Sequence, residues 1–431
     1  MLFLDLNSYF ASCEQQESPE LRGKPVVVAP VDADTTVAIA ASYEAKRFGI
    51  KTGTQIGEAK RLCPDLLVVP ARPALYVHFH NLVQRVAETV LPIDKVCSID
   101  EMRFRLIGVE REPGKARDLA LQMKKAMREH AGECLTCSIG VAPNSFLAKL
   151  ATEMQKPDGL VILQKEDLPS RLLGLKLTDF TGINVKMKAR LNAAGLFTVQ
   201  DMYDSSVAEL RRAFGSVVGE RWWYLLRGYE MDLPENEQKS LGHSHVLSPD
   251  DRTDTGCREV LLRLIQKATA RLRANELCAK SVNFHVHGMQ KSWQAHVRLD
   301  ATNDTITIND EFLRLWAGRD FERPLRVGLT FSDLVPAAAV TPSLFDGAVQ
   351  RGMLNNAVDR VNQKFGKNSV YLAGMQGAKD AASEKIAFNK TWLFSEGKDD
   401  NVWPDTFRGM PLTVEDLEGG APSDEERIDD P

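Results

Sequence analysis

The feature that most constrains this chain is a carboxylate placed inside an apolar, strand-like segment at the N-terminus. The segment MLFLDL has the composition of a buried strand, yet it contains Asp5. A second apolar segment, KVCSIDEMRF, contains the adjacent acids Asp100 and Glu101. A buried carboxylate is costly unless it is paired or binds a cation. Three such acids that converge would form a site, whereas separate acids would be local polar features.

The order of the predicted elements brings these acids together. Strands are predicted at the start of the chain, at 24–30 and 36–43, in a hairpin around the acid pair, and at CLTCSIGVA. Helices are predicted at 75–90, at 113–132 and at PNSFLAKLATEMQ. With residues 12–75 as a small insertion, the resulting β–α–β–β–α–β order predicts a ferredoxin-like sheet whose first and third strands are central neighbours. Asp5 would then lie beside Asp100 and Glu101.

Three carboxylates at such close range predict a site for divalent cations. Like charges repel strongly unless cations lie between them. Oxygen ligands suit Mg²⁺, and two such ions about 4 Å apart can activate an attacking hydroxyl and stabilise a leaving pyrophosphate. The alternative is that Asp5 caps the following helix and that Asp100 and Glu101 form a polar hairpin tip.

Composition limits the class of protein. A chain of 431 residues predicts several domains. The net charge is −5, but residues 415–431 contain eight acids and one arginine, so the rest of the chain carries +2 and can present local basic surfaces. That tail is predicted to be disordered. No apolar run reaches the ~18 residues of a membrane span, and no secretory signal is expected.

The seven cysteines predict reduced thiols in a cytoplasmic protein rather than a metal site. Cys134 and Cys137 form the only C-x-x-C, and no second pair completes a zinc site. Strand alternation in CLTCSIGVA predicts that these two side chains point to opposite faces of the sheet.

Five motifs, in this order and at matching spacing, closely resemble the Y-family translesion DNA polymerases of the DinB and UmuC types: DLNSYFASCE, LRGKPVVV, ASYEAKRFGIKTG, SIDE and CSIGVAPNSFLAKLATEMQKPDG. The resemblance extends from residue 1 to about residue 375. It implies an α+β fold, namely a right-hand polymerase with a ferredoxin-like palm, small fingers, a helical thumb and an α/β little finger. It also implies template-directed DNA synthesis past damaged bases, without proofreading.

The resemblance assigns each segment to a domain. The expected parts are the palm (1–11 and 76–165), the fingers (12–75), a thumb with a helix–hairpin–helix (166–232), a linker (233–241), the little finger (242–335), a clamp-motif loop followed by a C-terminal helix and strand (336–375), and a C-terminal extension with an acidic tail (376–431).

The resemblance also assigns the catalytic acids. Asp5, Asp100 and Glu101 match the catalytic and metal-binding carboxylates, and the Leu6 carbonyl matches a further metal ligand. Two Mg²⁺ ions are expected, with Mn²⁺ as an alternative. Phe10 matches the aromatic steric gate whose ring would clash with a 2′-hydroxyl. By periodicity alone, Phe10 would be a core aromatic of the palm.

Further positions match contacts to the incoming dNTP. Tyr43 and Lys46 match triphosphate contacts in the fingers, and Lys156 matches a lysine that reaches the triphosphate from the palm. DinB-type chains usually have arginine at the position of Lys46, so Arg47 is a candidate to share this contact. Gly53 matches a small residue over the nascent base pair. The alternatives are exposed helix charges for the three basic residues and a turn glycine for Gly53.

Two more segments match contacts to macromolecules. TGINVKMKARLNAAGL resembles a helix–hairpin–helix that binds a DNA phosphate, with Gly182 and Asn184 at its turn, where asparagine would take the left-handed conformation of a glycine. Residues 341–345 resemble a peptide that binds the sliding clamp, with Leu344 and Phe345 as anchors. Primer-template DNA, the clamp and accessory proteins of a mutagenesis complex are therefore the expected partners, and no membrane is. The alternatives are an ordinary helical turn and an apolar pair folded onto the little finger.

Two other functions remain open at this point. The first is a catalytically weak or inactive adaptor of the same family, acting in a mutagenesis complex. The second is a nucleotide cyclase, which uses a similar palm but has no place for the fingers motif, the helix–hairpin–helix or the little finger. A nucleoid-associated, cytoplasmic polymerase is the function that the motifs favour.

Overall fold

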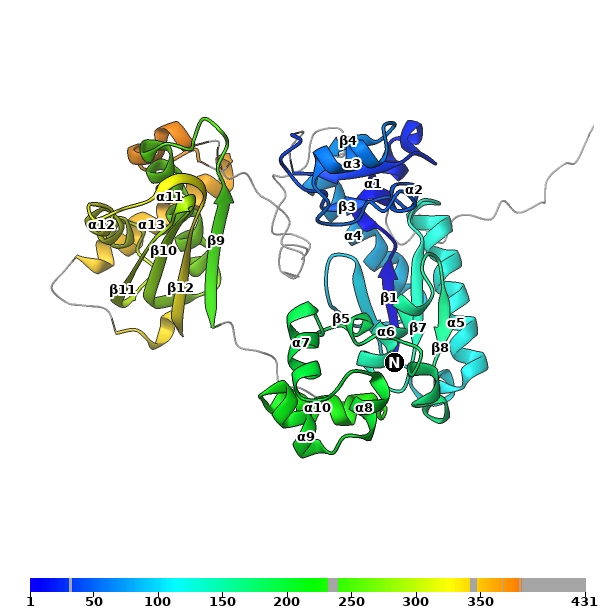
Figure 1. The fold of residues 1–431 in the computed structure, drawn as a ribbon. Coiled ribbons are helices and arrows are strands. Elements are labelled where there is room, and N and C mark those ends of the chain that lie inside the picture. Colours follow the sequence, from blue (N-terminus) through cyan, green and yellow to red (C-terminus); the bar gives the residue numbers. More distant parts are fainter. Residues whose placement is uncertain (31–32, 232–238, 342–346, 367, 380, 382–431) are drawn as a thin grey trace, which may run out of the picture. The chain divides into compact units, whose positions relative to one another are not determined.

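The structure is a computed structural model that describes residues 1–30, 33–231, 239–341, 347–366, 368–379 and 381. The described residues up to 231 belong to one compact unit, and those from 239 to 381 belong to a second. Figure 1 shows both units, each with its own sheet and helices. Each unit is described below by itself.

The first unit is built on a five-stranded sheet in the order β5-β6-β1-β7-β8. Its strands are β1 (Leu2–Leu6), β5 (Ile93–Val96), β6 (Glu101–Phe104), β7 (Cys137–Val141) and β8 (Leu160–Ile162). The β1 strand lies in the centre and pairs antiparallel with both β6 and β7. The hairpin of β5 and β6 and the central place of β1 confirm the predicted ferredoxin-like order, to which β8 adds a parallel edge strand.

Strand alternation divides the β1 side chains between two cores. Leu2, Leu4 and Leu6 pack in one cluster with α1 (Tyr9–Glu17), α4 (Pro73–Glu88) and α5 (Pro113–Ala126). Phe3 joins a second cluster on the opposite face, where it meets α6 (Ser145–Met154). Asp5 is two residues from Phe3 and therefore lies on the α6 face. The sheet is thus buried on both faces, and Asp5 is only 4% exposed.

The close approach of α6 to the sheet depends on Gly140 in β7. A Cβ atom at this position would lie 2.1 Å from the Ala148 carbonyl oxygen and 2.8 Å from the Ala151 Cβ. Only a glycine leaves room for the α6 backbone here. The absent side chain therefore allows the polar residues of α6 to reach the strand that carries Asp5.

Two smaller substructures complete the first unit. A three-stranded sheet, β3-β2-β4, has β2 (Val26–Ala29), β3 (Ala40–Ala41) and β4 (Leu67–Pro70), and it packs with α2 (Tyr43–Lys46) and α3 (Ile56–Leu62) around its own core. The chain from residue 166 is helical as predicted, with α7 (Val185–Ala193), α8 (Val199–Asp204), α9 (Val207–Phe214) and α10 (Val217–Leu226).

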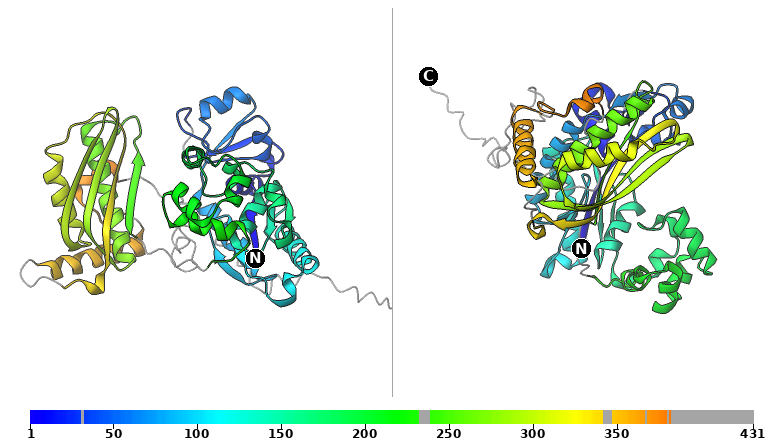
Figure 2. Two further views of the ribbon diagram at one scale, coloured as in Figure 1. Left: turned by 60° about the horizontal axis from the view of Figure 1, so that its bottom comes forward. Right: turned by 90° about the vertical axis from the view of Figure 1, so that its left-hand side faces the viewer.

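The second unit is a four-stranded antiparallel sheet in the order β11-β10-β12-β9. Its strands are β9 (Ser240–Val246), β10 (Leu277–Lys291), β11 (Trp293–Thr302) and β12 (Glu322–Pro336). The helices α11 (Asp254–Ala274) and α12 (Thr305–Trp316) share a core with one face of this sheet (Figure 2). The helix α13 (Ala348–Phe365) follows, at the predicted place.

Three local expectations were wrong. The strand predicted at 36–43 is reduced to Ala40–Ala41. The strand around the C-x-x-C begins only at Cys137. Cys134 therefore lies in the preceding turn, where its N–H donates to Gln16, and not on the opposite face of the strand. The third wrong expectation was a strand near residue 370.

All seven cysteines are free thiols.

The strand expected near residues 370–374 is also absent from the described residues, because other groups satisfy its backbone. The Val370 N–H donates to Asn362 Oδ1 at 2.9 Å, and the Val370 carbonyl accepts from Asn362 Nδ2 at 2.9 Å. A 3₁₀ helix over Ala373–Ala378 then buries Met375 in the core of the second unit.

The contact at Gly140 can be tested by a substitution to alanine. Gly140→Ala should push α6 from the sheet and lower the free energy of unfolding by about 1–3 kcal/mol, the usual range for overpacking. Chemical denaturation measures this change. The matched control is Gly114→Ala in α5, where a Cβ would meet nothing within 4 Å, so stability should not fall. Equal stability of Gly140→Ala and the natural chain would contradict the packing argument.

Candidate active site

Backbone pairing brings the three predicted acids to one place. In the register of β1 and β6, the Cα atom of Asp5 lies opposite that of Glu101. The Leu6 N–H donates to the Asp100 carbonyl at 2.9 Å, which fixes the residue that precedes β6. The N-cap residue of α1 is Ser8, and not Asp5, and no side chain makes a capping hydrogen bond there. The arrangement therefore favours a site over the alternative of a helix cap and an isolated hairpin tip.

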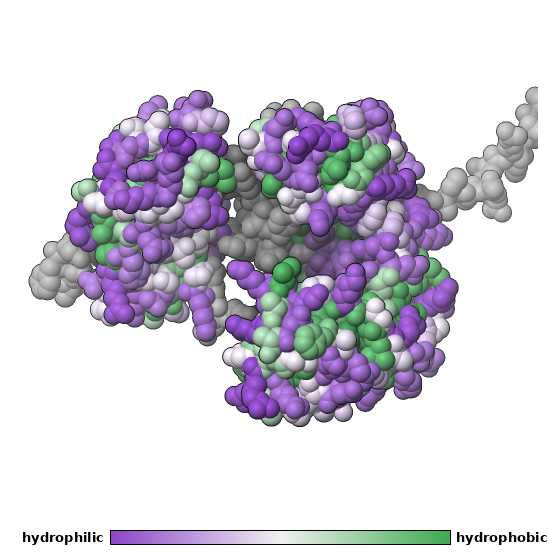
Figure 3. All heavy atoms as spheres, in the orientation of Figure 1, coloured by the Kyte–Doolittle hydropathy of each residue, from purple (hydrophilic) through white to green (hydrophobic). Residues whose placement is uncertain are grey.

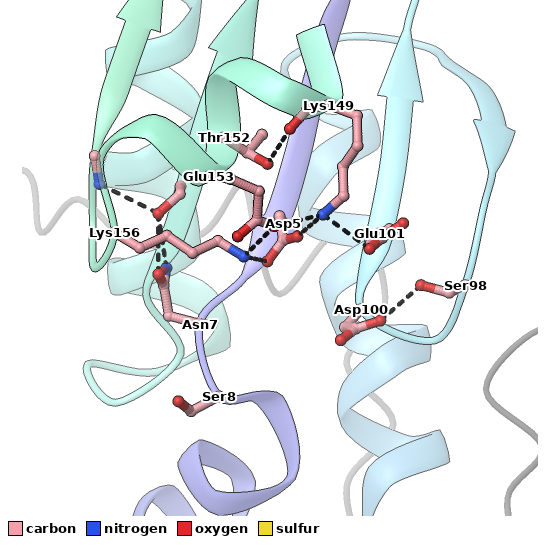
Figure 4. A network of polar contacts seen from close by, with 12 residues as sticks. Asp5, Asn7, Ser8, Ser98, Asp100, Glu101, Lys149, Thr152, Glu153 and Lys156 are labelled. Atoms are coloured by element: carbon pink, nitrogen blue, oxygen red, sulfur yellow. Dashed lines mark hydrogen bonds and ion pairs between the residues drawn. The ribbon is translucent and has the colours of Figure 1, made fainter. Parts of the chain in front are cut away.

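Asp5 is the centre of an ion-pair network (Figure 4). Its Oδ1 accepts a hydrogen bond from Lys156 Nζ at 2.7 Å, and its Oδ2 accepts one from Lys149. Lys149 Nζ also lies 3.0 Å from Glu101 Oε1 and 2.9 Å from Glu153 Oε1. Two ammonium groups thus neutralise a carboxylate that is buried inside the sheet, which is the condition for keeping a charge there.

Lys149 and Glu153 were missed by the sequence analysis. Both residues are in α6, four positions apart, so they lie on one face of the helix, and Lys156 follows two residues after its end. Glu153 Oε1 accepts from Lys149 at 2.9 Å and from Lys156 at 2.8 Å, so it holds both lysines beside Asp5. The available signal was the spacing of charges at 149, 153 and 156 next to a buried acid.

Charge shifts the pKa values of this network in the direction that keeps it ionised. Burial alone would lower the pKa of Lys149, but Asp5, Glu101 and Glu153 outweigh burial and raise it. Burial alone would raise the pKa of Glu153, but Lys149 and Lys156 lower it. Both groups are therefore charged at neutral pH.

Asp100 has a different environment. Burial raises the pKa of Asp100 to about 6, the hydrogen bond from Ser98 Oγ at 2.6 Å opposes this shift, and the charges of Asp5 and Glu101 add to it. The ionised form of Asp100 is therefore destabilised, mainly because the carboxylate is buried and to a smaller extent because two other acids lie nearby.

The donor set fits a hard divalent cation. Asp5, Asp100 and Glu101 offer only oxygen ligands, and the raised pKa of Asp100 indicates a place where added positive charge is favourable. Among the described residues, no three acidic, histidine or cysteine side chains already surround a common point, because the Lys149 ammonium lies between Asp5 and Glu101. A cation at the three carboxylates would require Lys149 to move.

These side chains line a pocket of about 270 Å³ together with Phe10. The Phe10 ring is 3% exposed and stacks on Tyr76, with ring centroids 4.4 Å apart at an angle of 21°. Phe10 is therefore both a core aromatic and a wall of the pocket, so the two predicted roles are compatible.

Lys46 reaches the same pocket from α2, and Tyr43 lies beside it. Lys46 lines it and donates to Ser8 Oγ at 2.7 Å, and its Nζ lies 4.2 Å from the centroid of the Tyr43 ring. Burial and the nearby Lys156 lower the pKa of Lys46. Burial and the charges of Asp5 and Glu153 raise the pKa of Tyr43 to about 12. Lys46 and Lys156 thus both line the pocket, an arrangement suited to a polyanion.

Three predicted nucleotide contacts, Tyr43, Arg47 and Gly53, are not among the pocket-lining residues. Arg47 is exposed at the end of α2, whereas its neighbour Lys46 lines the pocket. Gly53 has a positive φ of 90° in a turn, and Thr52 lines the pocket in its place. The structure therefore favours Lys46 over Arg47 and the turn role over the pocket role for Gly53.

The predicted phosphate-binding turn has a different geometry from the one expected at Asn184. Gly182 has the positive φ, 103°, while Asn184 is extended, with φ −86°, and caps α7 by accepting from the Met187 N–H at 2.9 Å. A capping side chain accounts for asparagine here, and the left-handed conformation was the wrong explanation. Apolar side chains gather on the surface of this helical region (Figure 3), and Val185, which follows the turn, is 79% exposed.

The predicted clamp anchors Leu344 and Phe345 lie outside the described residues, as do almost all of residues 376–431. In the described part of the chain, no helix is both long enough and apolar enough to cross a membrane.

The fold and the acidic centre together define a polymerase-type nucleotidyltransferase, and comparisons with known proteins identify the family. Residues 4–153 match the impB/mucB/samB family, and residues 238–344 match the C-terminal domain of that family. The DNA polymerase IV of Moorella thermoacetica is 32% identical over 385 residues, which cover 86% of this chain and 95% of the relative.

Solved structures agree in fold. A Y-family DNA polymerase chimera has a TM-score of 0.65 at 23% identity and covers 78% of this chain and 99% of its own. An insertion ternary complex of the Dbh DNA polymerase has a TM-score of 0.51 at 23% identity, with the same coverage. The chain belongs to the impB/mucB/samB family, that of the DinB-like Y-family polymerases, and it is a DNA-directed DNA polymerase.

Because folding raises the pKa of Asp100, keeping this carboxylate ionised lowers the free energy of unfolding of the metal-free protein. In EDTA, Asp100→Asn should raise the free energy of unfolding at pH 7 by about 2–3 kcal/mol, because the ionised form in the natural chain is disfavoured by folding. The difference should be complete above pH 6, where Asp100 is ionised in the fold. It should vanish as the pH falls toward 4, where Asp100 is protonated. Chemical denaturation at several pH values measures this.

The control for this experiment is Asp118→Asn, which changes an exposed acid of α5. It should leave stability unchanged at each pH. A destabilised Asp100→Asn protein, or a difference that does not depend on pH, would contradict the assigned environment of Asp100.

Proposed function

We propose that this polymerase adds dNTPs to a primer 3′ end opposite damaged or distorted template bases, without proofreading. The observation that carries the proposal is that Asp5, Asp100 and Glu101 line one pocket, and that cationic side chains line the same pocket. The primer 3′ oxygen attacks the α-phosphorus, the bond to the β-phosphate oxygen breaks, and pyrophosphate leaves.

The acids would hold the metal ions of the reaction. Polymerases of this family are metal-dependent, and Asp5, Asp100, Glu101 and the Leu6 carbonyl are the proposed ligands. Two Mg²⁺ ions, or Mn²⁺ in their place, supply charge neutralisation at the attacking and leaving oxygens when bound. Lys149 would leave its position between Asp5 and Glu101 and remain close to Glu153.

The remaining residues of the pocket would position the nucleotide. Lys46 and Lys156 bind the triphosphate as point charges, and Tyr43 supports Lys46 through its ring. The flat ring of Phe10, which lines the pocket, would exclude a 2′-hydroxyl. Fixed charges and fixed orientation, rather than covalent chemistry, would provide most of the acceleration.

Other segments would contact macromolecules. The turn at Gly182 and Asn184 places the N-terminus of α7 at the surface, where a DNA phosphate could accept from its free N–H groups. Residues 341–345 would bind the sliding clamp, and accessory proteins would join at the damaged site. We also propose the domain boundaries given above. The expected location is the cytoplasm, on the nucleoid.

Primer extension with Mg²⁺ and dNTPs, on undamaged and lesion-containing templates, tests the activity. Asp100→Ala should lower the rate by about 10³-fold, because it removes stabilisation of the transition state. Asp118→Ala, an exposed acid in α5, is the matched control and should extend normally. Extension that survives in Asp100→Ala would refute the site. A natural chain that is inactive alone but stimulates another polymerase would support the adaptor function.

The clamp contact can be tested separately. Replacing Leu344 and Phe345 with alanine should abolish the stimulation of primer extension by a sliding clamp, because an apolar anchor contributes most of such a contact. Extension without the clamp should stay at the natural rate. Undiminished stimulation by the clamp would exclude residues 341–345 as the contact.

A further inference from the structure

Behind the pocket, a buried carboxylate is connected to the Phe10 ring through a second aromatic. Glu14 is 0% exposed and lies in α1 four residues after Phe10, so both face the same side of the helix. Glu14 Oε1 accepts from the Tyr76 hydroxyl at 2.7 Å. Tyr76 is 1% exposed, and its ring is the one stacked on Phe10.

Each member of this chain of contacts is held at more than one point. Arg72 Nε donates to Glu14 Oε2 at 2.9 Å and to Oε1 at 3.2 Å. The Arg72 N–H donates to the Tyr76 hydroxyl oxygen at 3.1 Å. The Tyr9 hydroxyl donates to the Tyr76 carbonyl at 2.6 Å. A tyrosine fixed by hydrogen bonds at both its backbone and its hydroxyl cannot slide along the ring that it supports.

The ion pair of Glu14 and Arg72 behind Tyr76 is not needed for packing of the core. Phe10, Tyr76 and their neighbours would pack without an ionised glutamate, and a buried charge is costly unless it is fully paired. Glu14 is paired by Arg72 and by the Tyr76 hydroxyl, and burial together with Glu14 raises the pKa of Tyr76, so this hydroxyl remains a donor. Hydrogen bonds are directional, so they fix the orientation of the Tyr76 ring, and a fixed Tyr76 ring gives Phe10 a fixed surface to stack on.

We propose that Glu14, Arg72 and Tyr76 are positioning residues that fix the Phe10 ring in the pocket and thereby set the discrimination between deoxyribonucleotides and ribonucleotides. The inference rests on the proposed function, in which Phe10 lies against the sugar. A ring displaced by a fraction of an ångström would admit a 2′-hydroxyl while still supporting a deoxyribose, so sugar selection should be more sensitive than the rate of DNA synthesis.

Single-nucleotide insertion of a dNTP and of the matching rNTP by the full chain tests the proposal. Tyr76→Leu removes the stacked ring and should lower the ratio of kcat/KM for dNTP over rNTP by about tenfold or more, in keeping with the cost of small misplacements in active sites. Tyr76→Phe and Glu14→Gln retain the volume and should lower the ratio by a smaller factor. In all three variants, kcat/KM for the dNTP should stay within about threefold of the natural value.

Two controls separate positioning from a general loss of stability. Phe104→Leu truncates an equally buried aromatic of the same cluster, three residues along β6 from Glu101, and should leave the ratio unchanged. Phe10→Leu should lower the ratio at least as far as Tyr76→Leu does. Because Tyr76→Phe retains the ring and the core volume, it should fold even if Tyr76→Leu does not.

The experiment distinguishes failure of the network's role from failure of the role of Phe10 and from failure of the proposed function. A ratio that falls in Phe10→Leu but stays natural in Tyr76→Phe, Tyr76→Leu and Glu14→Gln would overturn the role of the network and leave the role of Phe10 intact. A natural ratio in an active Phe10→Leu protein would overturn the sugar-contacting role of Phe10 and this inference with it. A chain that extends no primer with dNTPs would overturn the proposed function itself.

Discussion

The pairing of the buried Asp5 carboxylate with the ammonium groups of Lys149 and Lys156 is the interaction on which the rest of the site depends. Asp5 lies in the central strand of a sheet that is covered on both faces, where an unpaired charge would be strongly destabilising. Its partners come from α6 and from the segment just beyond it, so the helix must lie close against β7. Gly140 makes that approach possible, and Glu153 holds both lysines in place.

The same network shows how a catalytic centre can be kept assembled before its substrates arrive. Lys149 bridges Asp5 and Glu101, so it holds two acids together that would otherwise repel each other. Asp100 accepts a hydrogen bond from Ser98, and its pKa is raised. Divalent cations would therefore replace Lys149 as the positive charge between these acids. Phe10, which lines the same pocket, stacks on Tyr76 in a separate network, so metal binding and sugar selection would have different structural supports.

The sheet and its acidic centre could be predicted from the sequence. Apolar patterns mark the strands that contain or adjoin Asp5 and Asp100, and the ferredoxin-like topology makes these strands neighbours. The helices α4, α5 and α6 were predictable from their periodicity. Lys149 was not, since a lysine on a helix is usually a solvent-exposed charge, and only the packing at Gly140 turns it toward the strand. The strand expected near Val370 was wrong because side chains of α11 and α13 bind its backbone.

The central claim is that Asp5, Asp100 and Glu101 form the metal-binding catalytic centre of this polymerase. Anomalous diffraction from crystals of the chain grown with primer-template DNA, a non-hydrolysable dNTP and Mn²⁺ tests it most directly. The account predicts Mn²⁺ within about 2.0–2.4 Å of carboxylate oxygens of Asp5 and Asp100, with Lys149 withdrawn from between Asp5 and Glu101. Manganese bound elsewhere, with Lys149 still paired to both acids in the ternary complex, would contradict it.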